Sequence, residues 1–344
     1  MLIQPDLGLV PTLARGGGEP KEMLSVRRDD GGKTYVKINY SSLSIILTCM
    51  RKSQLSLAMG LRSKSESPAL IFGTAVHKAL EIFYREPVGN RQLPSNFALT
   101  ADLMVSHNAE HDQPHFLYRA IRAFLNLAEP MRMLPERDKR SLQSGIWTLV
   151  HYFTTYIDDP FVVCADAKGP ITERTCEALL YDSPELAITF FGTIDVVLRN
   201  VKTNVVLPSD HKTFSSHAAD FFKRCKPNLQ YSGYIWLAQE CLGLDVNTFM
   251  VNGVEVKARP VTARGSPPNF PRQVTRRTSE DLEEFKESVV WGVKAYVAAL
   301  EGGVWVQGDV NACAMYNGCQ FQQVCEVPRS IRPNVIEANF NGGL

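Results

Sequence analysis

The sequence predicts an α/β or α+β fold, built as a single domain that carries a helical insertion. Apolar and aromatic residues recur at helical spacing before about residue 157 and again after residue 229. Between about residues 171 and 213 the pattern changes to β-rich runs. The chain has 344 residues, 44% of them hydrophobic and 21% charged, so it can bury a sizeable core.

The N-terminal segment is expected to be a flexible arm. Residues 1–36 contain three consecutive glycines, several prolines and scattered charges. Folded structure is then expected to begin at Ile38. The first helix is predicted over Tyr40–Leu61, with Ser41 or Ser42 as its N-cap, because a serine side chain can accept a hydrogen bond from the first turn.

The next part of the chain is predicted to be helical throughout. A second helix is expected over Leu70–Tyr84, followed by a helical insertion at about residues 87–170 within a single domain of residues 37–335. Three histidines in the insertion stand four residues apart, a spacing that suits a metal-binding face. The intervening Pro114 favours a polar helix end instead for these residues: His107, His111 and His115.

The β-rich region contains two runs, ITFFGTIDVVLR and VVLPSDHKT, separated by a short polar segment. A helix is expected next over Leu229–Leu242, and then a strand over about Thr248–Val256. With the earlier helices, this order of elements predicts one layered α/β or α+β domain.

Residues 257–277 form a proline-rich stretch without acidic residues, which predicts an irregular basic loop. Such a loop either contacts a polyanion or is merely solvated. Its basic residues are Lys257, Arg259, Arg264, Arg272, Arg276 and Arg277. After it, Ser279 is expected to cap a helix that runs to about Leu300 and starts with the acidic Glu280 and Asp281.

The charge and hydropathy of the chain limit the possible cellular locations of the protein. The formal net charge is only +1, so affinity for nucleic acid would have to come from local basic patches. We see no apolar run of membrane-spanning length and no secretory signal at the N-terminus. A cytoplasmic location is therefore expected, where thiols stay reduced and the eight cysteines are core residues or metal ligands rather than disulfides.

Two aspartates are predicted to face each other across the two β-rich runs. If Val201–Asn204 forms a four-residue hairpin loop, Asn200 pairs with Val205. Counting outward in antiparallel register then places Asp195 opposite Asp210, with Cβ atoms about 5 Å apart. Like charges this close repel each other unless a cation lies between them.

Strand alternation adds Lys212 to the same face as Asp210. Two carboxylates suit a hard divalent cation such as Mg²⁺ or Mn²⁺. A metal that polarises a phosphoryl oxygen and activates water, next to a lysine that orients the water or stabilises charge, fits phosphodiester hydrolysis. The alternative from these residues alone is a hairpin with a surface Asp–Lys ion pair.

Five motifs occur in a definite order over roughly residues 40–235: SSLSIILTCMRK, GTAVH, GTID, DHK and QYSGY, with a glutamate-bearing strand between the second and third. This order resembles the RecB-type branch of the PD-(D/E)XK nucleases, which includes lambda-exonuclease-like enzymes and the iron–sulfur nucleases of CRISPR and AddAB systems. The resemblance implies a restriction-endonuclease-like α/β core, with a mixed central sheet flanked by helices. The sequence departs slightly from the superfamily name, because Pro208 stands one residue earlier than expected.

The resemblance implies a role for each matching residue. His77, Asp195 and Asp210 would be metal ligands, and Lys212 would be the catalytic lysine. Gln230 and Tyr234, four apart on one helix face, would support the site or contact DNA. The glutamate of the site is either Glu173 or Glu177, and Glu177 is favoured because it leads directly into an apolar strand.

Four cysteines resemble the iron–sulfur ligands of the AddB-type and CRISPR-associated nucleases. Cys49 lies near the start of the fold, and Cys313, Cys319 and Cys325 follow near its end. Four thiolates can hold a [4Fe–4S] cluster, and zinc is the chemical rival. The five-residue spacings differ from the tighter arrangement of the family, so an unligated cysteine loop is the third reading.

The sequence thus predicts a metal-dependent DNA nuclease, more specifically an exonuclease, of phage or mobile-element recombination and repair. The resemblance implies DNA as partner, with a helicase, recombinase or single-strand-binding protein, and no membrane. Two other classes stay open: a metal-dependent phosphoesterase acting on small molecules, and a non-catalytic DNA-binding or scaffold protein. Cleavage of DNA with and without Mg²⁺ separates the three.

Overall fold

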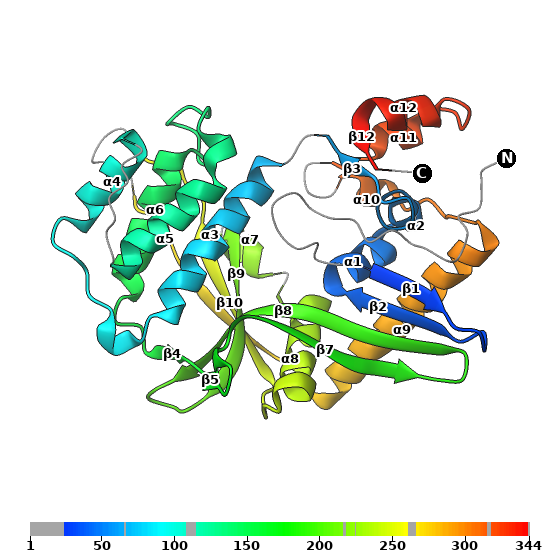
Figure 1. Ribbon diagram of the computed structural model, residues 1–344, viewed down its shortest axis with the longest axis horizontal. Coiled ribbons are helices and arrows are strands. Elements are labelled where there is room, and N and C mark those ends of the chain that lie inside the picture. Colours follow the sequence, from blue (N-terminus) through cyan, green and yellow to red (C-terminus); the bar gives the residue numbers. More distant parts are fainter. Residues whose placement is uncertain are drawn as a thin grey trace. The chain divides into compact units, whose positions relative to one another are not determined.

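A computed structural model describes residues 24–64, 67–107, 115–215, 218–223, 225–260, 266–314 and 318–342 (Figure 1). The chain divides into two compact units. The first comprises Met1–Ser65, Cys176–Gly192 and Ser279–Leu344, and the second comprises Glu66–Thr175 and Thr193–Thr278. Two long strands, β7 (Thr172–Asp182) and β8 (Leu186–Asn200), contain two of the four points where the chain passes from one unit to the other.

The first unit begins with an antiparallel hairpin of β1 (Leu24–Arg28) and β2 (Thr34–Asn39). Alternate residues of β2 are buried, as expected for a strand with one covered face, and β2 pairs in parallel with the first half of β8. The expectation of a flexible arm up to residue 36 is therefore wrong from Leu24 onward. Residues 1–23 of that prediction lie outside the described part of the chain.

The predicted first helix is split into three pieces: α1 (Tyr40–Thr48), α2 (Met50–Ser53) and the π-helical turn η1 (Gln54–Ala58). The break falls at Cys49, whose backbone is extended. The N-cap prediction is also wrong. The Asn39 side chain accepts the hydrogen bond from the Ser42 N–H at 2.9 Å, because asparagine at the strand end already has the extended backbone that an N-cap needs.

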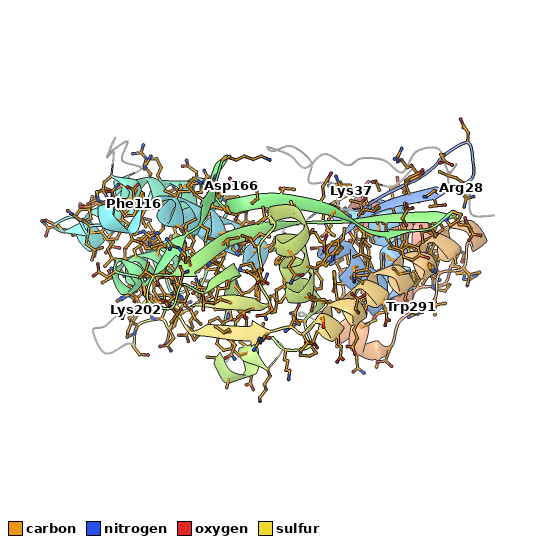
Figure 2. All side chains as sticks on the ribbon, turned by 90° about the horizontal axis from the view of Figure 1, so that it is seen from below. Arg28, Lys37, Phe116, Asp166, Lys202 and Trp291 are labelled. Carbon is orange, nitrogen blue, oxygen red and sulfur yellow. The ribbon has the colours of Figure 1, made fainter. Side chains whose placement is uncertain are left out.

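The long helix α9 (Ser279–Gly302) packs against α1 in the first unit. Close approach occurs at Gly292, where an added Cβ would lie 3.0 Å from the Leu43 side chain. Phe285 on the buried side of α9 meets Phe190 of β8 edge to face, whereas Trp291, labelled in Figure 2, is 65% exposed. The helix is thus amphipathic in the way its sequence predicts.

The C-terminal part of the first unit is a small helical cap. It contains α10 (Val310–Ala314), α11 (Gln322–Glu326) and α12 (Arg332–Asn339), and its last strand β12 (Phe340–Asn341) pairs with β3 (Arg62–Ser63). A separate apolar cluster holds these pieces together: Leu55, Leu61, Phe321, Val324 and Phe340. Because this cluster joins residues near 60 with residues near 330, both chain regions are fixed in one cap.

In the second unit, the second half of β8 pairs antiparallel with β9 (Val206–Phe214). β9 pairs in parallel with β10 (Thr248–Glu255), and β10 pairs antiparallel with β11 (Arg272–Arg276). The short β4 (Phe161–Val163) also pairs with β8, while β5 (Ala165–Asp166) and β6 (Gly169–Pro170) form a separate ribbon. Parallel and antiparallel pairs in one sheet confirm the predicted mixed sheet with flanking helices.

The helices of the second unit follow the predicted order. They are α3 (Pro68–Arg85), η2 (Val88–Asn90), α4 (Phe97–His107), α5 (Phe116–Leu127), η3 (Glu129–Met131), α6 (Leu142–Tyr156), α7 (Ala218–Phe222) and α8 (Leu229–Leu242). In Figure 1, α5 and α6 lie beside α3. The insertion is helical only as far as Tyr156, since β4–β6 occupy its last ten residues. The ring of His115 caps α5 at the Leu117 N–H, and His111 lies outside the described residues.

The predicted basic loop is only partly irregular, because β11 lies within it. Arg277 is buried, the Arg272 side chain is only 13% exposed, and Arg259 pairs with both carboxylate oxygens of Asp102 at 2.8 Å. Arg264 lies outside the described residues, and Arg276 is exposed. Arg272 and Arg277 are therefore structural, and the sequence missed this because their partners come from distant segments. In the part of the chain that is described, no helix is both long and apolar enough to cross a membrane.

Candidate metal centre

Three potential ligands converge in the second unit. His77 lies on α3, Asp195 on β8 and Asp210 on β9, and one ligand atom of each lies within 4.8 Å of the other two. α3 approaches β9 at Gly73, where an added Cβ would be 3.5 Å from the Thr213 hydroxyl. This approach brings the helix, one turn later, to the two aspartates.

The hairpin register that places the aspartates together is confirmed. The Asn200 N–H donates to the Val205 carbonyl at 2.9 Å, and paired residues continue to Val196 and Ser209. Asn204 adopts a left-handed conformation, with φ at 57°, which asparagine tolerates in a turn. The next pair in this register would be Asp195 with Asp210, as counted from the sequence.

The ladder between β8 and β9 gives way to a side-chain contact at this point. The His211 N–H donates to Oδ2 of Asp195 at 2.9 Å. Nδ1 of His77 lies 3.2 Å from the same oxygen. Asp195 therefore carries two partners, one from the neighbouring strand and one from the helix, which restricts its rotamer.

Lys212 completes the predicted arrangement. Its Nζ lies 2.6 Å from Oδ2 of Asp210, on the face of β9 that alternation predicts. The Asp210 side chain is only 2% exposed, whereas those of His77 and Lys212 are 28% and 31% exposed. The alternative of a surface ion pair is wrong, because the carboxylate is buried and the centre reaches solvent through the two basic groups.

The burial and mutual charge of these groups shift their pKa values in opposite directions. Burial, together with the charge and hydrogen bond of Asp195, raises the pKa of Asp210 to about 7, against the opposing charges of Lys212 and His77. Burial also acts on Asp195, but the charge and hydrogen bond of His77 hold its pKa well below the ordinary value. Burial lowers the pKa of His77, yet Asp195 outweighs it and raises the value to about 9.

Lys212 and His211 are fixed in their ordinary charge states. Although burial acts to lower the pKa of Lys212, the adjacent Asp210 raises it above its usual value, so the amine is protonated. Burial lowers the pKa of His211 to about 3, so its imidazole is neutral. The centre therefore contains a cationic lysine beside two carboxylates, and a neutral ring behind them.

Gln230 and Tyr234 lie on α8, where the Gln230 amide donates to the Tyr234 hydroxyl at 3.1 Å. Asn228 caps this helix and Gly243, with φ at 63°, ends it. Burial raises the pKa of Tyr234, and the charge of Asp210 adds to the effect while Lys212 opposes it. The charges of Asp210 and Lys212 therefore act on Tyr234, and the supporting role of this pair stays a prediction.

The two candidate glutamates lie on β7, in different units. Glu177 belongs to the first unit, where its carboxylate lies 2.6 Å from Lys37 Nζ. Glu173 belongs to the second unit and has a left-handed backbone, with φ at 46°. The assignment of Glu177 to the metal centre stays a prediction.

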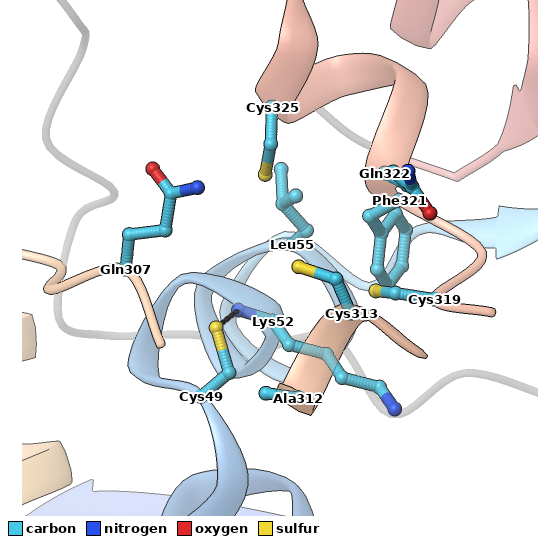
Figure 3. Close-up of a pocket in the computed structure, with 10 residues that line it drawn as sticks. All are labelled: Cys49, Lys52, Leu55, Gln307, Ala312, Cys313, Cys319, Phe321, Gln322 and Cys325. Carbon is cyan, nitrogen blue, oxygen red and sulfur yellow. Dashed lines mark hydrogen bonds between the residues drawn. The ribbon is translucent and has the colours of Figure 1, made fainter. Parts of the chain in front are cut away.

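The four cysteines singled out in the sequence line one pocket of the first unit (Figure 3). Cys49 comes from the break between α1 and α2, and the Lys52 and Gly308 N–H groups donate to its Sγ at 3.4 and 3.2 Å. Cys313 lies on α10 and Cys325 on α11, with Cys319 between them. Figure 3 shows all four thiols directed toward the same space.

Burial raises the pKa of the Cys313 thiol, and its neighbours Cys319 and Cys49 raise it further. Burial likewise raises the pKa of Cys325, against the opposing charges of Arg51 and Arg332. Thiols that disfavour each other's ionisation in this way gain most from a bound cation, which releases their protons. A metal or an iron–sulfur cluster on these four thiols stays a prediction, because among the described residues only His77, Asp195 and Asp210 place their ligand atoms within 4.8 Å of one another.

A buried polar network behind the centre was not anticipated from the sequence. It joins the middle residue of the DHK motif to one residue from each of α3, α6, the turn after α6, β10 and β11. The network consists of His211, Asn252, Tyr152, Tyr84, Arg272 and Asp159. These residues are far apart in the sequence and match no motif. Arg272 was visible only as part of a basic stretch, so its burial could not have been predicted.

The chain matches the PD-(D/E)XK nuclease superfamily over residues 37–326, a region that includes the metal centre and the four cysteines. Among solved structures, it is similar to a candidate exonuclease from Eubacterium rectale. The two chains are 14% identical, the alignment covers 86% of this chain and 91% of that one, and the TM-score is 0.41. No curated protein matches the chain.

Proposed function

Because the chain belongs to the PD-(D/E)XK nuclease superfamily, we propose that it is a divalent-metal-dependent deoxyribonuclease with its active site at His77, Asp195, Asp210 and Lys212. One observation carries the proposal. Three ligand atoms, one nitrogen and two carboxylate oxygens, lie within 4.8 Å of one another. Lys212 Nζ lies beside the same Asp210 carboxylate.

The donor set fits Mg²⁺ or Mn²⁺, since two buried carboxylates this close are stabilised by a cation between them and their oxygens are hard ligands. A bound cation of this kind polarises the phosphoryl oxygen and lowers the pKa of a water. Asp195 and Asp210 would hold the cation, with His77 at the solvent-facing side.

Lys212 supplies a protonated amine at the same place, because its pKa is raised by Asp210. A protonated lysine stabilises the charge that accumulates on a phosphoryl group during hydrolysis, and it orients the attacking water by donating a hydrogen bond. Gln230 and Tyr234 would support this arrangement or contact the DNA backbone from α8. Glu177 remains our candidate for the glutamate of the site.

The decisive experiment is cleavage of linear duplex, single-stranded and closed circular DNA, with Mg²⁺ or Mn²⁺ and with EDTA. Cleavage is expected with metal only. Loss of activity on closed circles would identify an exonuclease, because such an enzyme requires an end. Hydrolysis of a small phosphodiester without DNA cleavage would favour the phosphoesterase alternative, and binding without cleavage would favour the scaffold alternative.

Lys212→Ala is expected to lower the cleavage rate by about 10²–10³ while leaving the fold intact, since one charge-stabilising donor is commonly worth that much. Asp210→Asn should abolish metal-dependent activity by removing a ligand charge. Lys223→Ala is a matched control, because Lys223 is 74% exposed and pairs only with Asp220 among the residues described. Near wild-type cleavage by both site variants would show that the active site lies elsewhere.

We further propose that Cys49, Cys313, Cys319 and Cys325 hold one [4Fe–4S] cluster with a structural role. The four thiols line one pocket, and backbone N–H groups donate to Cys49 Sγ, as is common at cluster sulfurs. An added Cβ at Gly308 would lie 2.9 Å from the Thr48 carbonyl oxygen, so the close approach requires glycine. Zinc on the same four thiolates is the rival.

Metal analysis of anaerobically purified protein tests this proposal without an activity assay. About four iron and four sulfide per chain are expected, with a brown colour. Cys319→Ser should lose the iron, whereas Cys241→Ser should keep it, because Cys241 is exposed on α8 and outside the pocket. One zinc per chain would support the zinc rival, and folded protein with neither metal would leave an unligated cysteine loop.

The finer setting of the activity is also part of the proposal. We assign the protein to phage or mobile-element DNA recombination and repair, in the cytoplasm, acting on DNA with a helicase, recombinase or single-strand-binding protein as partner. The order of motifs supports this setting. The partner class would be tested by expressing a tagged form of this protein in its native host and identifying the proteins that co-purify with it.

A further inference from the structure

We propose that His211 is a positioning residue of the proposed nuclease site, held as a neutral Nε2–H imidazole by Asn252 and Arg272 from the two neighbouring strands. The inference rests on the proposed function for its consequence in catalysis, but not for its geometry. It concerns the middle residue of the DHK motif, whose side chain alternation turns away from Asp210 and Lys212.

His211 matters first through its backbone. The ladder between β8 and β9 continues to Val196 and Ser209, and the next available donor is the His211 N–H. This N–H donates to Oδ2 of Asp195 at 2.9 Å. Any displacement of His211 would therefore rotate a carboxylate of the proposed metal centre.

The ring of His211 is fixed by a row of residues across three strands. His211 of β9 is the register partner of Asn252 on β10, and Asn252 is the register partner of Arg272 on β11. Nδ2 of Asn252 lies 2.7 Å from Nδ1 of His211, and Nε of Arg272 lies 3.3 Å from Oδ1 of Asn252. The ring also stacks on Tyr84, with centroids 5.2 Å apart.

The donor and acceptor roles follow from the arginine. A guanidinium has only donors, so the Asn252 atom that faces Arg272 must be the carbonyl oxygen. The amide nitrogen of Asn252 then faces His211 and donates to Nδ1. Because a neutral imidazole carries one proton, that proton lies on Nε2. The network thus selects one tautomer.

The row is anchored at its far end by a buried ion pair. Arg272 donates to both carboxylate oxygens of Asp159, at 2.9 and 2.5 Å, and Asp159 is fully buried. Arg272 also donates to the Tyr84 hydroxyl at 2.9 Å. Tyr152 closes the network, since its hydroxyl accepts from Asn252 at 2.5 Å and lies 2.8 Å from that of Tyr84.

Nδ1 of His211, the Asn252 amide and the Arg272 guanidinium are therefore each paired with a group that is itself held. A satisfied buried network of this kind allows little movement, because breaking one bond leaves a buried group unpaired. Residues that orient a metal ligand from behind commonly change metal affinity or activity by about 10–100-fold when removed. The ring of His211 thus fixes the position of β9 at this residue, and the His211 N–H in turn fixes the carboxylate of Asp195.

The first test is the tautomer of His211 in the wild-type protein, read from long-range ¹H–¹⁵N correlation spectra without DNA or metal. The chain has seven histidines, and the signal of His211 is identified by its loss in the His211→Gln variant. A neutral Nε2–H ring at neutral pH is expected. An Nδ1–H tautomer would overturn the inference, whatever the activity of the protein.

The second test is Asn252→Asp, which keeps the shape but replaces the donor by an acceptor. Nδ1 of His211 should become protonated, and Mn²⁺ affinity and DNA cleavage should each fall by about tenfold. Asn269→Asp, at an exposed position, is the matched control. Unchanged Mn²⁺ affinity with an altered tautomer would show that His211 positions nothing.

If Asn252→Asp does not fold, Tyr152→Phe removes one hydroxyl of the network with the same readouts. A several-fold loss of Mn²⁺ affinity is expected. The control is Tyr296→Phe, since the buried Tyr296 hydroxyl makes no hydrogen bond within the described residues. Equal behaviour of the two variants would overturn the positioning role. Protein that binds Mn²⁺ but cleaves no DNA would refute the proposed function alone, because tautomer and affinity still report on His211.

Discussion

Replacing Asp195 by asparagine should lower the pKa of His77 in the metal-free protein. The Asp195 carboxylate lies 3.2 Å from Nδ1 of His77 and outweighs burial, raising the pKa of His77 from 6.5 to about 9. Without that charge, burial and the charge of Lys212 lower the pKa of His77 by more than the charge of Asp210 raises it, so the pKa should fall to 6.5 or below. A fall in the pKa of His77 from about 9 to 6.5 corresponds to about 3 kcal/mol of interaction free energy between His77 and Asp195.

This shift has a definite sign in a stability measurement. Since the pKa of His77 is raised in the folded state, its contribution is complete below pH 6.5 and is lost as the pH rises through about 9. The difference in free energy of unfolding between wild type and Asp195→Asn should therefore shrink by about 2.4 kcal/mol between pH 7 and 9.5. Asp220→Asn, at an exposed ion pair with Lys223, should show no such trend.

The assay is an NMR titration of His77 in EDTA, together with urea unfolding at several pH values. Wild-type His77 should titrate near pH 9, and the ring in Asp195→Asn should titrate at 6.5 or below. A wild-type midpoint near 6.5 would refute the reasoning, because it would mean that Asp195 does not hold the proton on His77.

Two other results are expected from the same geometry. Metal binding must displace the proton of His77, so Mn²⁺ affinity measured by calorimetry should rise about tenfold per pH unit from 7 to 9. The rise should be steeper below pH 7, where Asp210 also has to lose a proton, and a flat profile would exclude His77 as a ligand. Arg272→Gln should destabilise the protein by about 3–5 kcal/mol in urea unfolding, because it leaves Asp159 buried and unpaired. Arg276→Gln at an exposed position should stay within about 0.5 kcal/mol of wild type, and equal effects of the two variants would contradict the burial of Arg272.

Local patterns in the sequence were sufficient for the hairpin that carries both aspartates. Period-two alternation and a four-residue turn determine a register, and a slip by one residue would turn Asp210 and Lys212 to the other face. For the same reason α8 was predicted with its observed bounds, since Asn228 caps its start and Gly243 adopts the left-handed conformation that ends it. The proximity of Asp195, Asp210 and Lys212 was thus determined by the sequence alone.

Other features depended on partners that no local pattern encodes. The β1 strand was missed because a short strand in a glycine-rich region gains its hydrogen bonds only from β2. The convergence of His77 with Asp195 needs α3 to pack on β9, and the sequence suggested it only through a family resemblance.

Only the tertiary structure showed that Arg272 is paired rather than solvated and that the ring of His211 is held behind the site. Arg272 looked like part of a basic, solvated stretch, but Asp159 and Tyr84 pair with it from segments far apart in the chain. The sequence suggested no role for His211, which stands between two motif residues. Its partner Asn252 lies on the neighbouring strand β10 and is identified only by the structure. Periodicity and turn chemistry determine which residues share a strand face, whereas burial and charge pairing depend on which distant segments fill the space beside that face.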